Sequence, residues 1–155
     1  MHATTMRIRP FDEADGPAVV ALWQACGLTR PWNDPARDIA RKLAVQRDLF
    51  LVGIHDGVLM ASAMAGYDGH RGWVNYLAVH PDWRRQRHGE ALMHEVERRL
   101  LALGCPKLNL QVRSSNTQVL DFYRALGYLQ DDVVSLGKRL IADTPAGDPP
   151  PTSTS

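Results

Sequence analysis

The sequence has few of the features that would assign it to a specialised class of protein. It contains only two cysteines, Cys26 and Cys105, far apart in a chain of 155 residues. Such a pair is typical neither of a disulfide framework nor of a zinc site with paired ligands. No two histidines have the helical i, i+4 spacing of a metal site. We therefore expect no bound metal and a reducing compartment.

The sequence also lacks long apolar runs and a large net charge. No run approaches the roughly 18 apolar residues of a membrane span, and residues 1–9 lack the apolar stretch of a secretory signal. The formal net charge is +1, from 18 basic and 17 acidic side chains. A nearly neutral chain has no overall field that attracts nucleic acid or an anionic membrane. We expect neither as a partner, and we expect a cytoplasmic protein.

The composition is that of a globular domain. Hydrophobic residues make up 45% of the chain and charged residues 23%, which is close to the average for soluble domains. The length suits a single domain with its own core. Residues 144–155 are rich in Pro, Thr and Ser, with almost nothing apolar to bury. We predict one domain over residues 1–143 and a disordered tail over residues 144–155.

The apolar spacing predicts alternating strands and helices in the order β-α-α-β-β-β-α-β-α-β. The expected strands are residues 6–9, 49–54, 58–66, 72–79, 107–113 and 132–140. Helices are expected after Asp12 or Asp15, from Pro35, from Gly89, and after Asn116 or Thr117. The expected fold is α/β, with a mixed, mostly antiparallel central sheet flanked by helices in three layers.

One segment combines a buried strand, a basic loop and the start of a helix. The first turn of a helix has unpaired N–H groups and a partial positive charge, which together favour a pyrophosphate. Arginines beside it add donors for phosphate oxygens. The alternative is a solvated basic loop. The candidate binding residues are Leu77, Ala78, Val79, Arg84, Arg85, Gln86, Arg87, His88, Gly89 and Glu90.

A second segment places Asn116, Tyr123, Gly127 and Tyr128 on and after a predicted helix. A phenol, with a pKa of about 10, can donate a proton to a leaving group when it is partly shielded from water. The alternative is that Tyr123 packs in the core with its hydroxyl hydrogen-bonded.

These two segments resemble motifs A and B of the GNAT superfamily of acyltransferases. Motif A reads Arg or Gln, two residues, Gly, one residue, then Gly or Ala; Arg84 and Gly89 match its ends, and Arg87 replaces the middle glycine. Motif B reads Asn, six residues, Tyr, three residues, Gly, then an aromatic residue, and the second segment matches it throughout. Stretches 28–35, 66–72 and 135–140 are similar to the YpeA-like subgroup of bacterial acetyltransferases. The resemblance covers about residues 6–140.

The resemblance implies a GNAT fold and an acetyl-CoA-dependent N-acetyltransferase that works by direct attack in a ternary complex. It implies that the motif A residues hold the cofactor, that the backbone of residues 77–79 meets the pantetheine arm, and that Asn116 lies near it. Tyr123 would be the acid for the departing thiolate. The implied acceptor is an amine on a small molecule, peptide or protein, and any assembly is expected to be a homodimer.

The general base is not evident from the sequence. Many relatives use a glutamate on the strand before motif A, where this chain offers Asn75 and no carboxylate. Asp68, His70 or a water chain are the candidates, although Asp68 and His70 also suit an exposed turn. Asp34 could attract a cationic amine or could cap the helix from Pro35.

The same residues allow two alternative functional hypotheses. The replacement at Arg87 and the missing glutamate favour, as an alternative, a non-catalytic acyl-CoA-binding or sensing module. If Arg87 keeps a negative φ, its backbone N–H remains available to the cofactor. A nucleic-acid-binding role for the arginines is disfavoured, because the net charge is close to zero and no aromatic residues are interleaved with the arginines for stacking.

Overall fold

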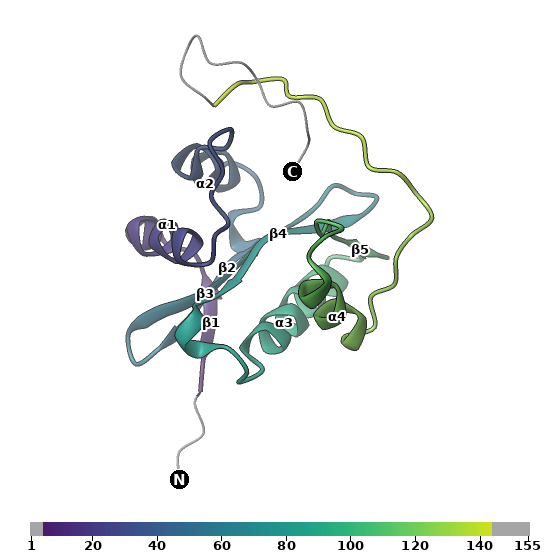
Figure 1. The fold of residues 1–155 in the computed structure, drawn as a ribbon. Coiled ribbons are helices and arrows are strands. Elements are labelled where there is room, and N and C mark those ends of the chain that lie inside the picture. The colour runs from purple at the N-terminus through teal and green to yellow at the C-terminus, as the bar shows by residue number, and fades with distance from the viewer. Residues whose placement is uncertain (1–4, 144–155) are drawn as a thin grey trace.

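The computed structural model describes residues 5–143 of the protein, which form a five-stranded sheet with helices on both faces (Figure 1). The strands are β1 (Arg7–Pro10), β2 (Phe50–His55), β3 (Val58–Tyr67), β4 (Gly72–Val79) and β5 (Leu108–Asn109). The α-helices are α1 (Gly16–Ala25), α2 (Pro35–Leu43), α3 (His88–Ala102) and α4 (Thr117–Ala125), and the 3-10 helices are η1 (Glu13–Asp15), η2 (Arg47–Leu49) and η3 (Pro81–Trp83).

The strands lie in the order β1-β2-β3-β4-β5. All neighbouring pairs are antiparallel except β4 and β5, which are parallel and are connected through α3. The turn at Asp56 and Gly57 joins β2 to β3, and both of its residues have positive φ, as a tight hairpin requires. The mixed, mostly antiparallel sheet predicted from the sequence is therefore confirmed.

Two apolar cores separate the helices into layers, one on each face of the sheet. Successive residues of a strand point to opposite faces, so Leu51 packs in the core beneath α3, whereas Val52 packs in the core beneath α1 and α2. Trp23 of α1 lies in the second core, and Leu92 of α3 lies in the first. These cores make the predicted three-layer arrangement.

Side-chain caps fix the starts of the helices where the sequence predicted them. The Asp34 carboxylate accepts from the Ala36 amide at 3.0 Å at the start of α2, and the Asn116 side chain accepts from the Val119 amide at 3.3 Å at the start of α4. Such caps satisfy amides that the first helical turn leaves unpaired. The sequence offered Asp12 or Asp15 as the cap of the first helix. In the structure Asp12 caps η1, and Asp15 is the N-cap position of α1.

Of the two strand predictions at the end of the chain, one is wrong and the other is confirmed only in part. Residues 132–140 form no strand, and of the predicted strand 107–113 only Leu108–Asn109 pairs with β4. Both stretches alternate apolar and polar residues as strands do, but a strand also needs a backbone partner. Beyond Asn109 the described residues supply none. The predicted tail, residues 144–155, lies outside the described residues.

No helix within residues 5–143 is both long enough and apolar enough to cross a bilayer.

Candidate active site

Strands β4 and β5 begin side by side and then lose contact. They are paired only at Gly72 with Leu108 and at Trp73 with Asn109. No further pair between them exists in the described part of the chain, so their facing edges beyond these residues lack a strand partner. Unpaired backbone N–H and C=O groups need another hydrogen-bonding partner. The separation therefore creates a place where an extended ligand can bind between two strands.

Strand β4 has an irregularity at the level of this separation. Its register with β3 shifts between the pairs Ser62–Ala78 and Met64–Asn75. Tyr76, inside the shift, has φ +53, an uncommon value for a residue other than glycine. A bulge of this kind bends the strand and redirects the residues beside it. The bulge lies in β4 after the last residue paired with β5, Trp73, and before the loop that follows.

A buried network supports the bulge from the α1 side of the sheet. Ser62 donates its hydroxyl to the Tyr76 carbonyl at 2.9 Å and accepts from the Trp23 indole N–H at 2.9 Å. The Tyr76 ring stacks on Trp23 with centroids 3.8 Å apart. The Tyr76 hydroxyl donates to Asp38 at 2.6 Å, and burial together with this bond raises the pKa of Tyr76. No spacing rule links these four residues, and the sequence analysis missed them.

Helix α3 begins directly after the loop that leaves β4. Its N-cap position, Arg87, makes no side-chain cap, and the first helical bond runs from the Ala91 amide to the Arg87 carbonyl at 3.0 Å. The amides of His88, Gly89 and Glu90 precede that bond and have no acceptor among the described residues. Three free amides and the helix dipole make an anion-binding end.

The loop residues Arg85 and Arg87 both adopt left-handed backbone conformations, with φ +65 and φ +63. The sequence left the sign of φ at Arg87 open, and the structure shows it to be positive. Glycine adopts this conformation without strain, whereas arginine does so at a cost of roughly 1–2 kcal/mol. Arg87 thus takes a backbone conformation that favours glycine, and its side chain is exposed.

Gly89 is the point where α3 meets α4. A Cβ atom added there would lie 3.2 Å from Cζ of Phe122 and 3.8 Å from Cγ2 of Val79. The absence of a side chain thus permits close contact between α3, α4 and the end of β4. This contact brings the two sequence segments together, since Phe122 adjoins Tyr123.

Tyr123 lies at the edge of the core beneath α3 and α4. Its side chain is 8% exposed, and its ring contacts those of Phe122 and Tyr128 edge to face. Burial raises the pKa of Tyr123 to about 12. The hydroxyl is therefore protonated at any physiological pH, and it can act as a hydrogen-bond donor.

The remaining candidates from motif A include four exposed loop residues and the buried His88. Arg84, Arg85, Gln86 and Arg87 are exposed, and Arg84 donates through Nε to the Val79 carbonyl at 3.2 Å. That carbonyl also accepts from the Cys26 thiol at 3.4 Å.

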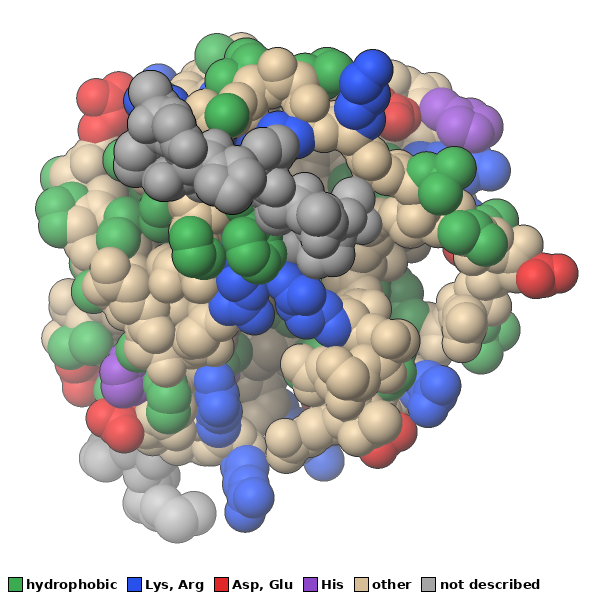
Figure 2. Space-filling model, turned by 45° about the horizontal axis from the view of Figure 1, so that its top comes forward, with side chains coloured by type: hydrophobic (Ala, Val, Ile, Leu, Met, Phe, Trp, Pro, Cys, Tyr) green, Lys and Arg blue, Asp and Glu red, His purple; other side chains and the backbone are tan. Residues whose placement is uncertain are grey.

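Figure 2 shows a hollow in one face of the molecule with Lys and Arg side chains around its rim.

His88 differs from its neighbours, because its ring points into the protein. It is 5% exposed, and its Nε2 has no partner among the described residues. Burial, and then the charge of His55, lower the pKa of His88. Its side chain packs near Trp83, and only its amide faces the anion-binding end.

The structure gives Asp68 and Asp34 structural roles. Asp68 accepts from the amides of His70 and Arg71, each at 2.7 Å. These bonds, from Arg71 and then His70, lower the pKa of Asp68, which makes it a weaker base. Both Asp68 and His70 lie exposed in the turn between β3 and β4. Asp34 caps α2, as described above.

Comparison with known proteins gives one family and one fold. The family model described as acetyltransferase (GNAT) family matches residues 17–128. An acetyltransferase of Yersinia enterocolitica is 49% identical over 138 residues, which cover 89% of this chain and 98% of that protein.

Among solved structures, the ribosomal-protein-S18-alanine N-acetyltransferase of Escherichia coli matches with a TM-score of 0.67 and 24% identity, over 79% of this chain and 77% of that one. The PaiA N-acetyltransferase of Thermoplasma acidophilum, solved in complex with coenzyme A, matches with a TM-score of 0.71 and 16% identity, over 84% of this chain and 93% of that one. At these identities the structures show a shared fold.

Proposed function

The chain belongs to the GNAT family of N-acetyltransferases, and on this premise we propose that it transfers an acetyl group from acetyl-CoA directly to an amine. The observation that carries the proposal is the separation of the parallel strands β4 and β5 beside the uncapped start of α3. A ligand with an extended arm and a pyrophosphate matches both features. Acetyl-CoA supplies the acetyl group as an activated thioester.

The described residues fit such a ligand along its length. The amides of His88, Gly89 and Glu90 would hold the pyrophosphate, and the exposed side chains of Arg85 and Arg87 would add charge beside it. The edge of β4 that lacks a strand partner, over Leu77, Ala78 and Val79, would pair with the amides of the pantetheine arm, and at Val79 the arm would compete with the Arg84 and Cys26 donors for the carbonyl. Asn116 caps α4 with its side chain, so its part in cofactor binding is indirect, through the position of α4.

Tyr123 acts on the sulfur as the C–S bond breaks and the new C–N bond forms. Its pKa of about 12 exceeds that of an ordinary thiol, roughly 8.5. Complete transfer of its proton to the thiolate would therefore be unfavourable. Tyr123 instead donates a hydrogen bond to the sulfur while negative charge develops there, and the thiolate takes its proton from solvent.

The amine must lose a proton as it attacks. Strand β4 offers Asn75 and no carboxylate at this level, and the hydrogen bonds that Asp68 accepts weaken it as a base. We therefore assign proton removal to water. This assignment requires the rate to rise with pH as the free acceptor amine loses its proton.

Calorimetric titration of acetyl-CoA tests the cofactor site. Gly89→Glu places a carboxylate at the start of α3, and Gly89→Gln is the matched control, because it presses on Phe122 equally but carries no charge. We expect the glutamate variant to bind at least about tenfold more weakly than the glutamine variant. Equal affinities in the two variants would place the cofactor elsewhere.

Release of free CoA thiol in the presence of peptide, polyamine and aminoglycoside acceptors tests catalysis. Tyr123→Phe should lower kcat by roughly 10- to 100-fold and leave the affinity for acetyl-CoA unchanged, because it removes only the donor to the leaving group. Binding of acetyl-CoA without turnover of any amine, in wild type and variant alike, would instead support the non-catalytic acyl-CoA-binding module.

A further inference from the structure

Two stretches singled out in the sequence, residues 28–35 and 135–140, take no part in the proposed cofactor site and meet in the fold. Arg139 of the second stretch donates through its guanidinium to the Trp32 carbonyl and to Oδ1 of Asn33 in the first. The first stretch forms most of the loop between α1 and α2. Segments from opposite ends of the domain therefore share one contact point.

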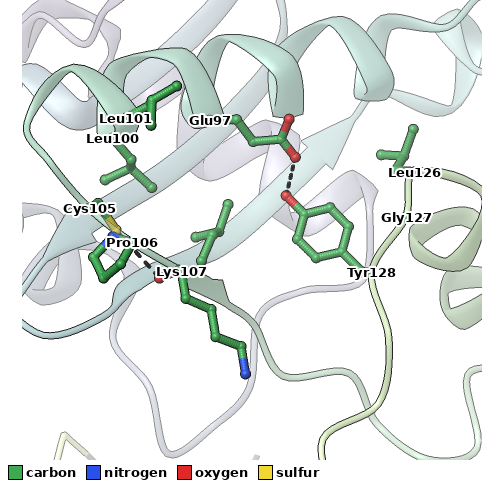
Figure 3. Close-up of a pocket in the computed structure, with 10 residues that line it drawn as sticks. Glu97, Leu100, Leu101, Cys105, Pro106, Lys107, Leu126, Gly127 and Tyr128 are labelled. Atoms are coloured by element: carbon green, nitrogen blue, oxygen red, sulfur yellow. Dashed lines mark hydrogen bonds between the residues drawn. The ribbon is translucent and has the colours of Figure 1, made fainter.

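The second stretch belongs to the segment after α4 (residues 129–143), which is held at both ends. At its start the Tyr128 hydroxyl donates to Glu97 of α3 (Figure 3). The segment then runs beside β5, where two side-chain contacts hold it, and arches over the end of the sheet to α2 (Figure 1). At its end Asp143 accepts from Arg41 of α2 at 2.7 Å. The contact with the α1–α2 loop is thus part of a segment with fixed ends.

The contact point lies near the bulge in β4. The hydroxyl of Tyr76, the residue inside the bulge, donates to Asp38 of α2 at 2.6 Å. Burial and this bond raise the pKa of Tyr76; of the weaker influences, the charge of Asp143 also raises it and the charge of Arg139 lowers it. Both charges therefore lie close to the Tyr76 hydroxyl. Since α3 and α4 would hold the cofactor on the other face of the sheet, the acceptor would approach the bulge from this face.

The carboxylates at this contact point already have partners. Asp34 caps α2 and forms an ion pair with Arg37. Asp38 and Asp143 both accept from Arg41. A cationic ligand would have to displace an arginine or a helix cap to reach any of the three carboxylates. The hypothesis that Asp34 attracts a cationic amine is therefore not favoured by its contacts.

Hydrogen-bond donors at the same place are left over. Arg30 donates to the carbonyls of Gly27 and Thr29, and Arg139 donates only to carbonyl and amide oxygens. Neither guanidinium forms an ion pair within residues 5–143. The Trp32 indole N–H is buried and has no acceptor among the described residues. A buried donor without a partner is uncommon, and it indicates a position where a ligand or water supplies the acceptor.

We propose that the acceptor is an amine that also carries a carboxylate, and that this carboxylate binds to Arg139 and the Trp32 indole N–H. The inference rests on the proposed acetyl transfer and names the class of acceptor. Paired guanidinium N–H groups match the two oxygens of a carboxylate, and Arg30 adds positive charge nearby. The amine forms the C–N bond as the thioester C–S bond breaks, and the carboxylate takes no part in the chemistry. Polyamines and aminoglycosides lack the group that these donors bind.

An NMR titration tests the carboxylate site without turnover. The isotope-labelled full chain, saturated with CoA, is titrated with glycine, β-alanine and γ-aminobutyrate, and with the primary amide of each. The three acids differ in the distance from amine to carboxylate. The Trp32 indole resonance, assigned by its absence in Trp32→Phe, should shift with at least one acid and not with the matching amide. The Trp73 indole, at the start of β4, is the internal reference. Equal responses of the Trp32 indole to every acid and its amide would overturn the proposal.

Steady-state kinetics tests the selectivity. In the wild type, kcat/KM for the preferred acid should exceed that for its amide by at least about tenfold. Arg139→Gln should bring this ratio towards one, and Trp32→Phe, which removes the N–H but keeps an aromatic ring, should lower it in part. Lys138→Gln removes a charge from the neighbouring exposed residue and should leave the ratio unchanged. A purely structural role for Arg139 would lower kcat/KM for acid and amide equally, and an unchanged ratio in Arg139→Gln would contradict the assignment.

The two experiments separate this inference from acetyl transfer itself. A shift of the Trp32 indole with an acid, without turnover of any amine, would support the carboxylate site and remove the proposed function. Turnover of amides or polyamines as fast as of the acids would support acetyl transfer and overturn the carboxylate site.

Discussion

Strands β2 and β3 are paired along their lengths and sealed by helices, whereas β5 is paired over two residues and the chain after α4 is open to solvent. Both regions have strand-like apolar alternation. In the first region every edge of the strands has a partner in the same chain. In the second region one edge of β5 faces the separation from β4, and the other faces the segment after α4.

The difference indicates where stability and function are placed in this molecule. The β2–β3 region supplies the buried area that makes the domain fold. The β5 region leaves backbone groups without a strand partner on both sides, one facing the separation from β4 and the other facing the segment after α4. Three substitutions and one change of pH should affect the two regions differently.

The largest effect should come from Trp23→Ala. Trp23 is completely buried, stacks on Tyr76 and donates to Ser62, so its loss leaves a large cavity and should lower the free energy of unfolding by about 3–5 kcal/mol. Leu136→Ala in the exposed segment is the control, and it should change the value by less than about 0.5 kcal/mol in dilute solution. Urea denaturation measures both. Similar losses in the free energy of unfolding for the two variants would mean that the core and the segment after α4 contribute equally to stability.

A smaller effect is expected for Ser62→Ala. The substitution removes the acceptor of the Trp23 indole and the donor to the Tyr76 carbonyl, and unsatisfied buried groups should destabilise the fold by about 1–3 kcal/mol. Because the network supports the bulge in β4, affinity for acetyl-CoA should fall as well. Denaturation and calorimetry on one sample separate the two effects, and Ser62→Thr, which keeps the hydroxyl, is the comparison variant.

Acid should release the segment after α4 before it unfolds the core. The hydrogen bond from Arg41 lowers the pKa of Asp143 to about 2, from 3.8. A lowered pKa stabilises the anchored form above about pH 4, and this contribution is lost as the pH falls towards 2. Hydrogen exchange of residues 129–143 should therefore accelerate between pH 4 and pH 2. In Asp143→Asn this pH dependence should be absent.

The smallest effect should come from Arg87→Gly. Glycine removes the strain of the left-handed backbone but increases the entropy of the unfolded chain, so the free energy of unfolding should change by less than about 1 kcal/mol. Arg85→Gly, with nearly the same φ, is the matched variant. A loss of more than 2 kcal/mol on thermal unfolding would mean that the Arg87 side chain supports the fold.

Much of the candidate site could be predicted because its parts are local in sequence. The loop from Arg84 to Gly89 is one continuous segment, and the caps at Asp34 and Asn116 act on amides two or three residues away. The supporting network could not be predicted, because Trp23, Asp38, Ser62 and Tyr76 come from four separate elements. The conformation of Arg87 was also left open, since a positive φ is uncommon for arginine.

Local patterns were enough to predict the order of the strands and α-helices as far as α4, the two-sided sheet and the two segments that contain Gly89 and Tyr123, because hydrophobic periodicity and turn chemistry are local properties. Which of the strand-like stretches become strands depends instead on tertiary contacts. Residues 132–140 have the pattern of a strand and remain unpaired within the described chain, because pairing depends on a backbone partner that no local pattern can supply.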